Sequence, residues 1–238
     1  MQTPTMKTPV SKCIELATYA IRMFGKFPTN VVLTSLAAEM TSAQANLGTT
    51  QQDYTVAVEE VLPARVDVKY ENLMADRRIR LTQQKAEMAD GKKNGRIMGM
   101  VFPDGSTPIM RLQGASQIQA MSDLEGRLES AAGLWTEAMS EKADTTKQRE
   151  SYAAALKYRS DIAQKVRDKR AKRNAAKDAF ITKYVEITSR VAAEFPRDGI
   201  MQDLFFDEVR AQSALAESDE EGEAEALGGE NPGERASG

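Results

Sequence analysis

The chain has 238 residues and a formal net charge of −3, with 41% hydrophobic, 28% charged and 6% aromatic side chains. It contains no histidine and one cysteine, which excludes Ser-His-Asp triads, histidine-ligated zinc sites and an intramolecular disulfide framework. The many Ala, Glu, Lys, Arg, Met and Gln residues favour helices over sheets. We therefore expect a predominantly all-α protein that is not an enzyme and carries no catalytic, metal or cofactor site.

The first 48 residues predict a pair of helices. Thr8 and Pro9 are typical of a helix start, and Gly25 and Gly48 suit the two helix ends. The N-terminal residues lack the apolar segment and small-residue cleavage site of a signal peptide, and no stretch approaches the roughly 18 apolar residues of a membrane span. We accordingly expect a cytoplasmic protein, with a component of a virion or another assembly as the alternative.

A third helix is predicted from Thr49 or Thr50 to residue 90, with an interruption near Pro63, which disturbs a helix interior. Beyond this proline, apolar residues recur at helical spacing and predict the packing face: Val66, Tyr70, Leu73, Leu81 and Met88. The charged run at 76–80 predicts that much of this helix is solvated.

Residues 95–114 interrupt the helical pattern. Two short apolar runs, 97–102 and 109–112, flank a Pro-Asp-Gly-Ser sequence that suits a tight turn. We predict a two-stranded β-hairpin here. Because an isolated hairpin is marginal in water, we expect it to pack against a helix, a neighbouring subunit or another apolar surface. Insertion of its apolar tip into a membrane is a further alternative.

Two long helices are predicted at 116–141 and 144–195, followed by a short amphipathic helix at 200–215. Trp135 lies on the apolar face of the first helix and is expected to be a core anchor. The heptad seam of the second helix is mostly apolar near its two ends, but Arg170, Arg173 and Lys177 occupy its middle. The two ends can therefore bury a stripe against partner helices, whereas the middle needs acidic partners or must stay at the surface.

The basic run at 165–177 has two interpretations. It could follow nucleic-acid phosphates without reading bases. The candidate residues for this role are Lys165, Lys169, Arg170, Arg173 and Lys177. Alternatively, it is a solvated helix middle partly paired with acids of a neighbouring helix, for which the candidates are Glu71, Asp76 and Glu87. No aromatic residues are interleaved for stacking on single strands.

These patterns predict an elongated bundle of long antiparallel helices with one small β-hairpin at 95–114. The expected parts are an N-terminal helical pair (1–48), a long-helix bundle (49–216) and a disordered acidic tail (217–238).

The leading functional hypothesis is a non-enzymatic structural or scaffolding protein that self-associates as a homo-oligomer. Narrow apolar stripes on long helices leave seams partly uncovered, and oligomerisation covers them, as in coiled coils. The candidate self-association residues are Met98, Met100, Phe102, Ile109, Phe180, Tyr184 and Ile187. Non-specific nucleic-acid binding through residues 165–177 is the alternative, and membrane activity through the hairpin tip is the third. The sequence indicates no small-molecule substrate.

Overall fold

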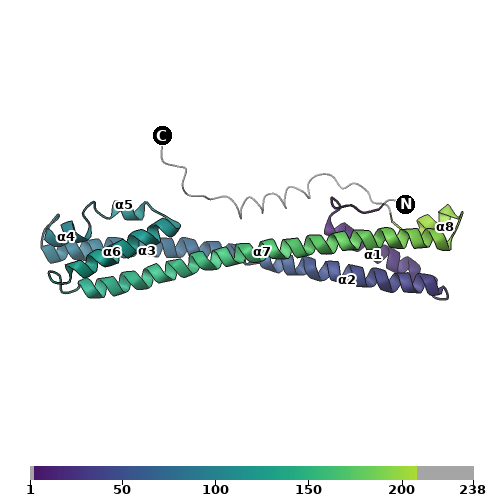
Figure 1. Cartoon of the computed structure of the whole chain (residues 1–238), viewed down its shortest axis with the longest axis horizontal. Coiled ribbons are helices and arrows are strands. Elements are labelled where there is room, and N and C mark those ends of the chain that lie inside the picture. The colour runs from purple at the N-terminus through teal and green to yellow at the C-terminus, as the bar shows by residue number, and fades with distance from the viewer. Residues whose placement is uncertain (1–2, 208–238) are drawn as a thin grey trace, which may run out of the picture. The chain divides into compact units, whose positions relative to one another are not determined.

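The computed structural model describes residues 3–207, and every regular element within that range is an α-helix (Figure 1). The helices are α1 (Val10–Phe24), α2 (Val31–Glu59), α3 (Val61–Asp90), α4 (Arg96–Val101), α5 (Thr107–Met110), α6 (Gly114–Ala131), α7 (Ala138–Glu194) and α8 (Gly199–Leu204). The predicted all-α class is confirmed. The predicted tail at 217–238 lies outside the described residues, as does the part of the last predicted helix beyond residue 207.

The described chain divides into two compact units that share the 57-residue helix α7. Unit 1 contains residues 3–58 and 164–207, and unit 2 contains residues 59–163. At 1.5 Å per residue, α7 alone is about 85 Å long. The domain boundaries predicted after residues 48 and 216 would separate parts that fold independently, and they remain predictions.

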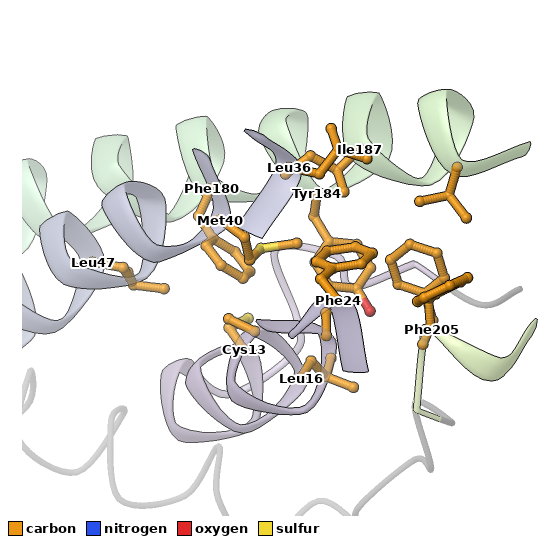
Figure 2. Packing of buried hydrophobic residues seen from close by; sticks show 14 of the residues in the cluster. Cys13, Leu16, Phe24, Leu36, Met40, Leu47, Phe180, Tyr184, Ile187 and Phe205 are labelled. Carbon is orange, nitrogen blue, oxygen red and sulfur yellow. The ribbon is translucent and has the colours of Figure 1, made fainter. Parts of the chain in front are cut away.

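Unit 1 is held together by one apolar cluster. Figure 2 shows that side chains of α1, α2 and α7 pack together with the side chain of Phe205, which directly follows α8. The ring of Phe205 stacks on that of Phe24, with centroids 5.4 Å apart, and on that of Phe195, 5.6 Å away. These aromatic contacts fasten the segment after α7 to α1.

Helices α2 and α7 run antiparallel within unit 1. Lys169 forms an ion pair with Asp53 near the end of α2, whereas Arg190, later on α7, pairs with Glu39, earlier on α2. The residue number therefore rises along one helix as it falls along the other. The seam predicted on α7 faces inward here, since Phe180, Tyr184, Ile187 and Val191 are all fully or almost fully buried.

Unit 2 packs α3, α4, α5 and α6 with the first part of α7 (Figure 1). Its α3 and α7 are also antiparallel, because Glu141 of α7 pairs with Lys85 whereas Tyr152, later on α7, donates to Asn72. Trp135 is buried in the unit 2 core, as expected from the sequence. It does not lie on a helix, however, because the helix predicted at 116–141 ends at Ala131 and Trp135 belongs to the connection between α6 and α7.

The predicted β-hairpin at 95–114 is wrong, since this segment forms the short helices α4 and α5. The reason lies in Asp90 at the end of α3. Its two carboxylate oxygens accept hydrogen bonds from the backbone N–H groups of Ile97 (3.0 Å) and Met98 (2.7 Å), which satisfies the first amides of α4. The apolar side chains then pack on α3 and α6, so the expected packing of this segment against helices is observed.

The helix end predicted at Gly48 is also wrong. Gly48 does not end a helix, because α2 continues through it to Glu59. The hydroxyls of Thr49 and Thr50 donate to backbone carbonyls four residues earlier instead of capping a new helix. By contrast, the break expected near Pro63 is observed at residue 60, between α2 and α3. Pro63 then lies in the first turn of α3, where a backbone N–H is not needed.

Candidate functional site

The basic run at 165–177 lies in unit 1 beside α2. Lys169 donates to the Asp53 carboxylate, with 2.5 Å between Nζ and Oδ2. This hydrogen bond lowers the pKa of the Asp53 carboxyl. The acid that meets Lys169 is therefore none of the three suggested by the sequence. Those three accept hydrogen bonds from glutamines instead: Glu71 from Gln148, Asp76 from Gln117 and Glu87 from Gln83.

Arg173 is only 5% exposed although it occupies the middle of the α7 seam. The carbon of its guanidinium lies 4.4 Å from the ring centroid of Tyr54 on α2. A cation over an aromatic face is attracted by the ring quadrupole, and the apolar stem of the arginine fills space beside it. An aromatic partner thus accommodates a basic residue in a helix seam.

The other candidate nucleic-acid residues differ in exposure. Lys177 donates to the Met6 carbonyl oxygen at 2.8 Å. Arg170 is half-buried, and Lys165 is exposed. Three of the five candidates (Lys169, Arg173 and Lys177) therefore contact other parts of unit 1.

The candidate self-association residues lie inside the units. In unit 2, Met98, Phe102 and Ile109 are buried and Met100 packs at the edge of the same cluster. The other three belong to the unit 1 core: Phe180, Tyr184 and Ile187. Because six of these seven side chains are buried within their own unit, self-association requires a different surface.

Unit 2 contains a buried charge cluster centred on Glu141, whose side chain is 1% exposed. Its carboxylate accepts hydrogen bonds from the Thr82 hydroxyl at 3.0 Å and from Lys85 Nζ at 2.5 Å, and it forms an ion pair with Arg78. Arg78 also pairs with Asp144, at 2.9 Å. These bonds tie α3 to the first turns of α7, so the cluster serves packing. Within residues 3–207, no group of three or more Cys, Asp or Glu side chains is arranged to hold a metal ion.

Helix α3 carries an exposed apolar face. Six large apolar residues on it are between 41% and 79% exposed, and we call them the α3 stripe: Leu62, Val66, Tyr70, Leu73, Leu81 and Met88. Their spacings of three, four, seven and eight residues place them within an arc of about 100° on a helix with 3.6 residues per turn. The stripe extends over almost the whole length of α3.

The buried face of α3 lies on the opposite side. It consists of mainly small residues: Ala64, Ala75, Ile79, Thr82 and Ala86. Five of the six members of the α3 stripe were predicted from their helical spacing to form the packing face, which is wrong, because they are exposed. The alanines on the opposite face were the missed signal, because small side chains let neighbouring helices approach closely. The α3 stripe is therefore not used for packing inside unit 2.

No protein-family model, curated protein or solved structure matches this chain. Among the helices of residues 3–207, none combines the length and the apolar character needed to cross a bilayer.

Proposed function

We propose that the protein is a non-enzymatic structural protein that self-associates through the α3 stripe. The observation that supports this is the exposure of six large apolar side chains on one face of a 30-residue helix. Large exposed apolar side chains that gather on one face commonly mark an interaction site, because burial of apolar surface is favourable by about 25 cal/mol per Å². The elongated form expected from the sequence stays a prediction, which small-angle scattering would test.

The test is the solution mass of the full chain, measured by light scattering at micromolar concentrations. We expect the parent to be a homo-oligomer and the double variant Leu73→Gln/Leu81→Gln to be a monomer with unchanged helix content, since both side chains are exposed. The matched control is Val56→Gln/Val185→Gln, which changes two equally exposed apolar residues on α2 and α7. A parent that stays monomeric at the highest concentration would contradict the proposal, as would a stripe variant that still assembles.

A further inference from the structure

We propose that two copies of this chain pair antiparallel along their α3 stripes, about a two-fold axis that passes beside Arg77. This inference rests on the proposed self-association and specifies its surface, orientation and register. A two-fold interface uses the same patch on both copies, so the patch has to be complementary to itself when one helix is reversed.

The apolar pattern of α3 meets this requirement around Arg77. Val66 lies eleven residues before Arg77 and Met88 eleven after it. Leu73 and Leu81 lie four residues to either side. On reversed helices centred at Arg77, Val66 of one copy therefore faces Met88 of the other, and Leu73 faces Leu81.

The polar positions of the same face follow the same symmetry. Tyr70 and Gln84 lie seven residues to either side of Arg77, so an aromatic ring with a hydroxyl faces an amide. Arg77 of one copy faces Arg77 of the other. The long stem of each arginine can lie along the apolar surface while its guanidinium extends to solvent. A polar residue at one core position of a helix pair typically sets the register at some cost in affinity.

The charges on one side of the stripe complement each other in this arrangement. On this side, Lys69 lies eight residues before Arg77 and Glu87 ten after it, so the two are offset by about 3 Å along the axis. Long side chains span this offset easily, and the Lys69–Glu87 pair occurs twice in a two-fold dimer. On the other side, Lys85 is already bonded to Glu141 of its own chain, so it contributes no pair across the interface.

A parallel pair would lack this complementarity. In a parallel homodimer, each flank of one helix meets the opposite flank of the other, so Lys69 and Glu87, which share a flank, could not pair across the interface. A Lys69–Glu87 pair between the two copies therefore requires the antiparallel orientation.

Charge exchange tests the register. Lys69 and Glu87 are 18 positions apart on one helix, about 27 Å, so they cannot interact within one copy. Lys69→Glu and Glu87→Lys, each alone, should raise the dissociation constant measured by sedimentation about tenfold, because each turns two attractive pairs into repulsive ones. The double variant K69E/E87K should restore the parent value. Exchange at Arg22 and Glu186, two exposed charges of unit 1, is the matched control, and we expect no change in the constant when Arg22→Glu and Glu186→Lys are combined.

Cysteine cross-linking tests the orientation independently. Arg77→Cys should form a disulfide-linked dimer under mild oxidation, since position 77 faces itself. Tyr70→Cys alone should remain unlinked, whereas a mixture of Tyr70→Cys and Gln84→Cys should cross-link. The native Cys13 is buried and its burial raises the pKa of the thiol, so the parent treated in the same way gives the background.

The outcomes separate this inference from the proposed function. A monomeric parent contradicts both. If the parent is an oligomer and the Leu73→Gln/Leu81→Gln variant is a monomer, the proposed function is supported. If, in addition, Tyr70→Cys alone cross-links, or K69E/E87K fails to restore the dissociation constant of the parent, the antiparallel register is overturned while self-association stands.

Discussion

Arg173 shows how a charged side chain can be part of a helix seam. It is almost fully buried, and its guanidinium lies over the ring of Tyr54. The sequence alone indicated that a basic residue in this seam would need an acid or would stay at the surface. The structure adds an aromatic partner from a helix more than a hundred residues earlier in the chain.

We expect Arg173→Gln to lower the free energy of unfolding by about 2 kcal/mol, because the substitution removes a desolvated cation–π contact and much of the packed stem. Chemical denaturation would measure the loss. Arg167→Gln is the control, since Arg167 is exposed and bonds only locally to Gln164 among the contacts of its side chain that the structure shows. Equal stability of the two variants would show that Arg173 does not serve packing.

Glu141 is a second polar residue that is almost fully buried. Glu141→Ala would leave the Arg78 guanidinium and the Thr82 hydroxyl without this acceptor in a buried site. Removing one partner of a buried ion pair typically costs 3–5 kcal/mol, and we expect about 3 kcal/mol because Asp144 still pairs with Arg78. Thermal unfolding would measure the change against Glu150→Ala, which alters an exposed position of α7. A loss of less than about 1 kcal/mol would contradict the structural role of the cluster.

Among the helices, α4 depends on a carboxylate outside its own sequence. Partial desolvation by itself raises the pKa of the Asp90 carboxyl, but hydrogen bonds from the N–H groups of Met98 and Ile97 lower it overall. Gly95 is required beside it, because a Cβ at that position would lie 2.2 Å from Asp90 Cγ. The short helix thus depends on a contact between the end of α3 and the residues that begin α4.

This arrangement predicts a pH dependence. Because the folded-state pKa of Asp90 is below its ordinary value of 3.8, its contribution to stability is present above that value and is lost as the pH falls through the folded-state pKa. We expect Asp90→Asn to be less stable than the parent at pH 7 and the difference to disappear at the lowest pH at which both still fold. Unfolding curves recorded from pH 7 downward would show this convergence. A difference that stays constant with pH would contradict the role of the charge.

For the whole chain, binding of nucleic acid by the basic run at 165–177 would distinguish the scaffold hypothesis from the nucleic-acid-binding hypothesis. We expect no measurable binding of the full-length protein to duplex DNA at low salt, because Lys169, Arg173 and Lys177 are engaged within unit 1. Fluorescence anisotropy with a labelled duplex would test this. Saturable binding that weakens with salt, and that Lys165→Gln/Arg167→Gln/Lys172→Gln abolishes, would favour the nucleic-acid alternative.

Self-association of the whole molecule is expected to raise its stability against unfolding. If the α3 stripes bury each other, folding and assembly reinforce each other by mass action, and the apparent melting temperature rises with protein concentration. We expect the stripe to be the source of this coupling, because the core residues of both units are already buried within one chain.

The sequence by itself determined the helical class and the inward face of α7, because the 3.6-residue period is a local property that neighbouring residues express together. It also indicated Trp135 as a core residue and the interruption near Pro63. Only the tertiary structure decided which of the two faces of α3 is buried. Both faces are apolar, and the alanine face was selected by the helices that pack closely against it. The same holds for residues 95–114 and for Arg173, since Asp90 and Tyr54 supply partners that no local pattern contains.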